Sequence, residues 1–153
     1  MSYIMDLRKL VGHRTLIMPC ACVIIGDGKG NILLQHRTDN NLWGYHGGSI
    51  EIDEEVEEAL RREVKEELNL ELDEIELFKI VSGKETHYTY PNGDDVSPID
   101  IVYVSHKFHG DLKVDLSEVK EVKWFNSKNL PKEMTLSNAN VIKAYFKKYN
   151  FNL

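Results

Sequence analysis

The chain has 153 residues, of which 42% are hydrophobic and 29% are charged, and its formal net charge is -6. This length fits one folded domain, and the composition is that of an ordinary globular protein rather than of a disordered or repetitive chain. The negative charge argues against nucleic acid as a partner, because backbone phosphates are bound by clustered Lys and Arg side chains. Any anionic substrate would therefore need bridging cations.

The first residues of the sequence do not resemble a signal peptide or a membrane anchor. The segment from Met1 to Val11 contains Asp6, Arg8 and Lys9 among its apolar positions, and the sequence has no apolar run of about 18 residues. We therefore expect a cytoplasmic protein that has no membrane partner.

The first elements in chain order are a short amphipathic helix over residues 3–11 and a hairpin with strands over 16–25 and 31–36. The glycines of the turn between these strands do not indicate a phosphate-binding loop, because no Gly-Lys-Ser/Thr follows them. Cys20 and Cys22 point to the same side of the first strand. A disulfide that short would be strained, and we expect packed thiols rather than half of a metal site.

The acidic segment from Glu51 to Glu67 is the main helix candidate. Asp53 is the expected N-cap, with carboxylates in the first turn favoured by the helix dipole. Asn69 can adopt the left-handed conformation that ends many helices. Apolar residues at three- and four-residue spacing supply a face for the core, namely Val56, Ala59, Leu60, Val64 and Leu68.

The second half of the chain alternates strands and turns before a last helix. Strands are expected over 75–81, 99–108 and 119–125, a turn over 90–94 and a helix over about 138–149. Strands mixed with three helices predict a layered domain of the α/β or α+β class that covers residues 1–153.

Three glutamates, Glu63, Glu66 and Glu67, project from the main helix into an arc of about 100 degrees. Like charges this close repel one another unless something compensates them. Their carboxylates are hard oxygen ligands of the kind that Mg²⁺ and Mn²⁺ prefer, and such ions hold phosphate oxygens and lower the pKa of bound water. From charge alone, the alternative is a solvated acidic face.

The spacing around these glutamates resembles the Nudix box, whose pattern is Gly, five residues, Glu, seven residues, Arg-Glu-aliphatic-any-Glu-Glu-any-Gly-aliphatic. The sequence matches it at Gly48, Glu54, Arg62, Glu63, Val64, Glu66, Glu67 and Leu70, with Asn69 in place of the glycine. A looser resemblance runs from residue 16 to residue 131. The resemblance implies the α/β/α sandwich of the Nudix hydrolases, with a mixed central sheet and a loop-helix catalytic motif.

Two positions depart from the family's pattern. Asn69 replaces the box glycine at little cost, since Asn tolerates the left-handed conformation. His46 stands where many members carry proline before the double glycine, so the loop loses a fixed backbone angle and gains a titratable group near the metals. We interpret His46 as tolerated variation, with a substrate contact as the alternative.

The resemblance also implies roles for individual residues. Metal would be bound by the carboxylates of Glu63, Glu66 and Glu67 and by the carbonyl of Gly47. Arg62 and Glu54 would pair to brace the loop and the helix. With Mg²⁺ or Mn²⁺ bridging the phosphates, water would attack one phosphorus in line and hydrolyse a phosphoanhydride bond.

The base that takes the proton of the attacking water is expected either in the box or in a later loop. Glu118 is the leading later candidate, because its position six residues before Trp124 resembles that of a loop glutamate in some family members. Glu121 is the close competitor. For both, an exposed carboxylate at a strand edge is the alternative.

The implied partner is a small-molecule nucleotide, a nucleoside diphosphate linked to another moiety such as ADP-ribose or a sugar. Alternatives are hydrolysis of a nucleoside triphosphate and a non-catalytic nucleotide sensor, although the intact glutamates argue against a sensor. An acidic interaction helix would leave the matches at Gly47, Gly48 and Arg62 unexplained. Trp43, Tyr45 and Tyr88 could stack on a base or simply pack in the core. A homodimer stays open.

Overall fold

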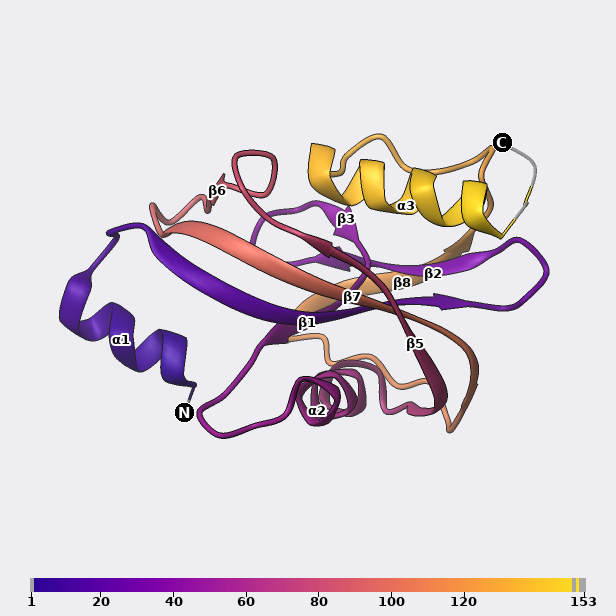
Figure 1. Ribbon diagram of the computed structural model, residues 1–153, viewed down its shortest axis with the longest axis horizontal. Helices are drawn as coiled ribbons and strands as arrows, with labels where there is room; N and C mark the ends of the chain where they lie inside the picture. Colours follow the sequence, from indigo (N-terminus) through magenta and orange to yellow (C-terminus); the bar gives the residue numbers. More distant parts are fainter. Residues whose placement is uncertain (1, 150, 152–153) are drawn as a thin grey trace.

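The computed structural model describes residues 2–149 and 151. An eight-stranded mixed sheet lies between helix α2 (Val56–Leu68) and helix α3 (Leu136–Lys148), with helix α1 (Tyr3–Val11) at one end of the sheet (Figure 1). This arrangement confirms the predicted α/β/α sandwich with a mixed sheet. In the described part of the chain, no helix is long and apolar enough to cross a membrane.

The strands that pair with one edge of the central strand β1 change along its length. Strand β1 pairs in parallel with β7 on one edge, while on its other edge β2 pairs only near the hairpin turn and β4 pairs with residues 20–23. The order is β3-β2-β1-β7-β5, with β4, β6 and β8 paired to β1, β7 and β2. The strands are β1 (Leu16–Gly26), β2 (Ile32–Arg37), β3 (Trp43–Gly44), β4 (His46–Ser49), β5 (Glu71–Val81), β6 (Tyr88–Thr89), β7 (Asp95–His109) and β8 (Val119–Phe125).

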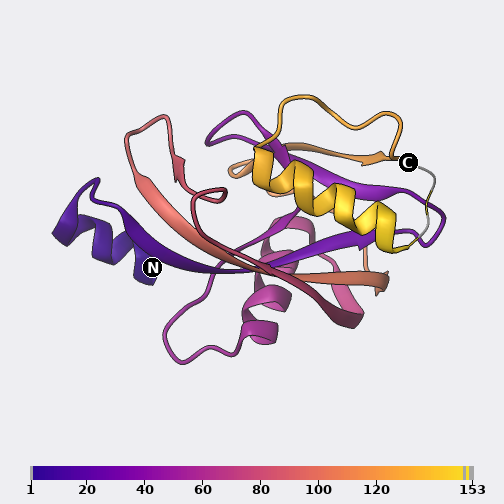
Figure 2. The same cartoon turned by 45° about the horizontal axis from the view of Figure 1, so that its top comes forward.

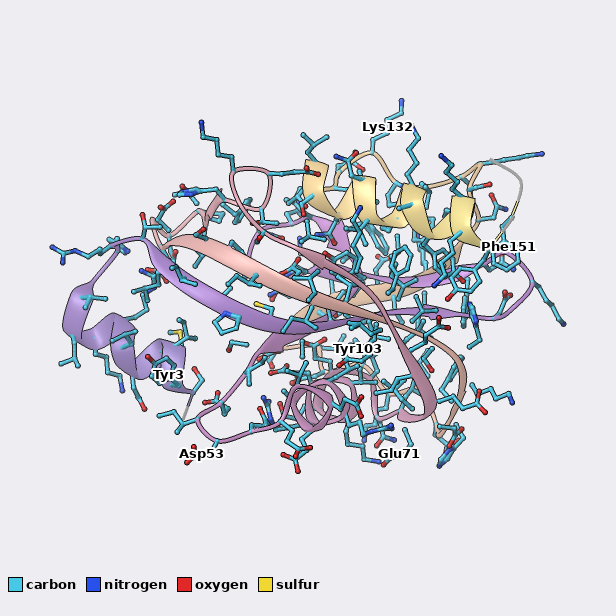
Figure 3. The ribbon with its side chains drawn as sticks, in the orientation of Figure 1. Tyr3, Asp53, Glu71, Tyr103, Lys132 and Phe151 are labelled. Atoms are coloured by element: carbon cyan, nitrogen blue, oxygen red, sulfur yellow. The ribbon has the colours of Figure 1, made fainter. Side chains whose placement is uncertain are left out.

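From Cys20 onward, strand β1 is buried on both faces and divides the core in two. Ala21, Val23 and Ile25 pack on the side of α2, where Tyr103 also lies (Figure 3). The alternate residues Cys20, Cys22 and Ile24 pack on the side of α3. Both cysteines are free and buried, which confirms the prediction of packed thiols.

The start of helix α2 was predicted at the wrong residue. Asp53 is not the N-cap, because its φ of 63° places it in a left-handed turn before the helix. Glu55 takes that position, and the carboxylate of Glu58 accepts a hydrogen bond of 3.0 Å from its backbone N–H. The end of the helix is as expected: Asn69 is left-handed, with φ 58° and ψ 33°.

Several other elements differ in length from the expectation. Helix α3 begins at Leu136, two residues earlier than predicted, because the side chain of Thr135 caps it by accepting a hydrogen bond from the Asn138 N–H. Strands β5 and β7 begin at Glu71 and Asp95, before their apolar runs. The early residues of β5 are charged because β5 lies at the edge of the sheet, where side chains reach water.

Helix α1 is attached to the sheet by polar contacts at its two ends. The Tyr3 N–H donates to the Glu51 carboxylate at 2.8 Å, and the guanidinium of Arg8 donates to the carbonyl of Asp95 at 2.6 Å. Seen from the second direction, α1 lies beyond the adjacent ends of β1 and β7 (Figure 2). The two contacts tie this helix to the segment before α2 and to the start of β7.

Candidate active site

The double glycine lies close to the backbone of β1 at Gly47 and to the side chain of Glu63 at Gly48. Gly47 has a φ of 142° and faces Cys22 across the β1–β4 ladder. A Cβ at this position would lie 2.2 Å from the carbonyl oxygen of Ala21. A Cβ on Gly48 would lie 2.5 Å from the carboxyl carbon of Glu63. The two glycines therefore let the loop approach both the central strand and helix α2.

Arg62 joins the loop to the helix through three acceptors. Its Nε and Nη2 donate to the two carboxylate oxygens of Glu54 at 2.7 and 2.9 Å, and Nη1 donates to Glu63 at 2.8 Å. Nη2 also lies 3.2 Å from the carbonyl oxygen of Ser49. The hydrogen bonds from Arg62 lower the pKa of Glu54. The Arg62–Glu54 pair implied by the resemblance is thus present.

The three box glutamates occupy different environments. Glu67 is only 4% exposed, and its Oε2 has no hydrogen-bond partner among the described residues. Burial raises its pKa from 4.5 to about 8, against the effect of nearby Arg37. Burial also raises the pKa of Glu63, which Arg62 opposes. Glu66 is exposed, lies 3.5 Å from Arg62 and does not line the cavity beside the other two.

These oxygens suit a hard divalent cation. A buried carboxylate with an unpartnered oxygen requires either a proton or a cation, and carboxylate and carbonyl oxygens are the ligands that Mg²⁺ and Mn²⁺ prefer. Within the described residues, no group of three or more Asp, Glu, His or Cys side chains is already placed to hold a metal ion. Glu63 is held by Arg62, so binding a cation would require Glu63 to share or leave that contact.

A cavity of about 420 Å³ opens beside Glu63 and Glu67, and Arg37 lines its wall. The guanidinium of Arg37 donates to both carboxylate oxygens of Asp39, at 2.9 and 2.7 Å. The sequence reasoning missed Arg37. The available signal was weak: a cation directly after the apolar run of the predicted strand over 31–36.

The two candidate bases, Glu118 and Glu121, differ in whether they line the cavity. Glu118 lines the cavity, and its charge contributes to raising the pKa of both Glu63 and Glu67. Glu121 does not line the cavity and instead binds Lys123 at 3.0 Å. Of the two, only Glu118 is brought together with the box glutamates.

The loop before Glu118 is tied to the end of α2. The backbone N–H groups of Lys113 and Asp115 donate to the carbonyls of Leu68 and Glu67, at 2.9 and 3.0 Å. The side-chain amide of Asn69 donates to the carbonyl of Asp111 at 3.0 Å. The helix that carries the glutamates therefore also anchors the loop that carries Glu118.

His46 is fully buried, with its Nε2 2.8 Å from the carbonyl oxygen of Leu33. Burial lowers its pKa from 6.5 to about 4, so the ring is neutral at ordinary pH. His46 also lines the cavity, and its Nδ1 has no hydrogen-bond partner among the described residues, so tolerated variation and a substrate contact both stay open.

The three aromatic residues considered for base stacking all line the cavity, and each also has a partner within the fold. Trp43 stacks on His36 with ring centroids 4.7 Å apart. Tyr88 packs edge to face against Tyr90, and the Tyr45 hydroxyl donates to Asp100 at 2.7 Å. Asp100 is a second cavity residue that the sequence reasoning missed.

Comparison with known proteins agrees with this geometry. Residues 17–145 match the NUDIX domain, and the chain belongs to that family. It is 32% identical over 120 residues to the NAD-capped RNA hydrolase NudC of Vibrio vulnificus, an alignment that covers 78% of this chain but only 42% of that protein. The chain thus spans less than half of that relative's length.

Two other relatives are matched over most of their length. The ADP-ribose pyrophosphatase of Methanocaldococcus jannaschii is 33% identical over 145 residues, which cover 92% of this chain and 80% of that protein. The crystal structure of the MutT NUDIX hydrolase from Burkholderia pseudomallei aligns with a TM-score of 0.71 and 26% identity, covering 84% of this chain and 97% of that one. The predicted family is therefore confirmed.

Proposed function

We propose that the protein is a metal-dependent hydrolase that cuts the pyrophosphate bond of a nucleoside diphosphate linked to another moiety, with ADP-ribose as the leading substrate. The observation that carries the proposal is the buried, unpartnered carboxylate oxygen of Glu67, which lies with Glu63 at the wall of a substrate-sized cavity. A purely structural glutamate gains nothing from this environment, since burial disfavours its charged form.

Each part of the site has a role in this reaction. The carboxylates of Glu63, Glu66 and Glu67 and the carbonyl of Gly47 would hold Mg²⁺ or Mn²⁺, which supplies positive charge to the phosphates and lowers the pKa of bound water. Arg62 fixes Glu63 and the loop in place through Glu54 and Ser49.

Arg37 and Glu118 act on the substrate and on the attacking water. The guanidinium of Arg37, oriented by its two bonds to Asp39, binds a phosphate oxygen in the cavity. The carboxylate of Glu118 accepts the proton of the water that attacks phosphorus. Glu118 is suited to this task because it lines the cavity and binds no cationic side chain of the described residues.

The choice of ADP-ribose over a nucleoside triphosphate is supported by the pyrophosphatase relative, which is matched over 80% of its length. The NAD-capped RNA hydrolases are matched over less than half of theirs, and they add NAD to the compounds worth testing. A non-catalytic sensor is the remaining alternative, which the retention of Glu63, Glu66 and Glu67 disfavours.

The test is a substrate panel with the purified protein in Mg²⁺ and in Mn²⁺. The panel contains ADP-ribose, NAD, nucleotide sugars, dinucleoside polyphosphates and nucleoside triphosphates, and the products are identified by mass. We expect AMP and ribose 5-phosphate from ADP-ribose. Pyrophosphate release from triphosphates alone would favour the alternative reaction. Binding without turnover of any compound, by a protein that is folded and metal-loaded, would favour the sensor.

A further inference from the structure

Asp100 is a carboxylate in the cavity that the proposed chemistry does not use. It lies on β7, opposite Cys20 of β1 and Val81 of β5, and it lines the cavity together with Tyr45. The Tyr45 hydroxyl donates to its Oδ2 at 2.7 Å. Among the described residues, no cationic side chain forms an ion pair with Asp100.

The carboxylate of Asp100 lines the cavity and can accept further hydrogen bonds besides the one from Tyr45. An ionised carboxylate has two oxygens and room for about four donors, of which Tyr45 supplies one. Its neighbours across the sheet are the buried thiol of Cys20 and an aliphatic side chain, which supply no strong donor. Burial raises the pKa of Asp100, and the hydrogen bond from Tyr45 opposes this effect.

Tyr45 holds this carboxylate in a fixed place. The Tyr45 backbone N–H donates to Asn138 Oδ1 at 3.2 Å, and its side chain is buried in the core on the α3 side of the sheet. Tyr45 is therefore held by its backbone and by the packing of its ring, independently of its contact with Asp100. A carboxylate oriented by a rigid partner in a cavity meets the geometric requirement for reading one donor group of a ligand.

We propose, resting on the proposed function, that Asp100 is a specificity-determining residue that accepts a hydrogen bond from an N–H or O–H group on the base or the sugar of the bound nucleoside. Tyr45 is the positioning residue that orients it. An ionised carboxylate cannot donate, so a ligand that presents an acceptor, or nothing, at this place leaves Asp100 without its partner and is disfavoured.

The experiment compares the parent with Asp100→Asn, which keeps the size of the side chain and an oxygen for Tyr45 but replaces one acceptor by a donor. The matched control is Asp111→Asn, at an exposed position outside the cavity. The probes are ADP-ribose, IDP-ribose, which lacks the amino group of the base, and 2′-deoxy-ADP-ribose, which lacks a sugar hydroxyl. We measure kcat/KM with Mg²⁺ and the calorimetric Kd with Ca²⁺ in its place, because the anionic probes need a bridging cation.

We expect the parent and Asp111→Asn to prefer ADP-ribose over one of the two analogues by about tenfold or more. Asp100→Asn should lose that preference. If the analogue that the parent disfavours is IDP-ribose, the donor is on the base, and if it is 2′-deoxy-ADP-ribose, the donor is on the sugar. Tyr45→Phe, the second variant, should lose part of the preference. The proposal would be overturned if the preference in both variants stayed within about twofold of that of the parent. It would also be overturned if the parent bound none of the three probes. Calorimetric discrimination without turnover would instead contradict the proposed hydrolysis alone.

Discussion

Replacing Glu67 by Gln tests whether Glu67 is a metal ligand or only part of a solvated acidic face. The substitution keeps size and removes the charge. Because burial raises the pKa of Glu67 from 4.5 to about 8, the folded chain holds this proton more tightly than the unfolded chain does. Raising the pH through this window therefore lowers the free energy of unfolding of the metal-free parent.

The size of the effect follows from the same pKa. Each pKa unit corresponds to about 1.4 kcal/mol, so the metal-free parent loses about 3 kcal/mol by pH 7 and about 5 kcal/mol above pH 8. The neutral Gln side chain resembles the protonated acid. We expect Glu67→Gln to match the parent near pH 4 and to be about 3 kcal/mol more stable at pH 7.

The assay is urea unfolding with a chelator present, repeated from pH 4 to pH 9. Glu57→Gln is the control, since Glu57 is exposed on the same helix and its removal should shift stability by a small amount with little dependence on pH. If the difference in free energy of unfolding between Glu67→Gln and the parent stayed constant from pH 4 to pH 9, the argument from burial would be refuted.

The same variant is then assayed for turnover at saturating metal and at the metal concentration that half-saturates the parent. Loss of a metal ligand should lower kcat by about a hundredfold or more, as does loss of groups that stabilise developing charge, while Glu57→Gln should keep the parent's rate. A rate near that of the parent, at metal concentrations where the parent is half-saturated, would remove Glu67 from the metal site.

Three further predictions follow from the site. Turnover should vanish on exhaustive chelation and return with Mg²⁺ or Mn²⁺, and activity that persists in chelator would contradict the metal mechanism. Glu118→Gln should lower kcat more than Glu121→Gln, because only Glu118 lines the cavity, and the reverse order in initial rates would reassign the base. Gly47→Ala should lower the free energy of unfolding by roughly 3 kcal/mol, since its Cβ would meet the Ala21 carbonyl at 2.2 Å. Gly28→Ala, with positive φ but open space, should cost about 1 kcal/mol, and equal losses in urea unfolding would contradict the steric argument.

The features predicted correctly are those that local spacing determines. Helical periodicity placed Ala59, Leu60, Val64 and Leu68 in the core, and all four are buried. The start of α2 was wrong because Asp is a preferred N-cap residue and Glu is not, so the sequence favoured Asp53 over Glu55, which is the N-cap in the structure. Only the left-handed backbone of Asp53, set by the turn into the helix, distinguishes them.

Arg37 and Asp100 were missed for a different reason. Each enters the cavity because distant strands are paired: β2 ends at Arg37 where its register with β8 shifts, and Asp100 lies opposite Cys20 through the parallel β1–β7 ladder. No motif connects these positions along the chain. The sequence predicted the residues carried by the loop-helix motif, whereas the presence of Arg37 and Asp100 in the cavity depends on the tertiary fold.

Asn69 illustrates how a departure from a family pattern can add a contact. A glycine at this place would allow the same left-handed end of α2, but it has no side chain to bind the carbonyl of Asp111. With Asn, the segment between β7 and β8 is held at one more point to the helix that carries Glu67. We expect this additional contact to restrict the movement of Glu118, the proposed base, relative to Glu67, a proposed metal ligand.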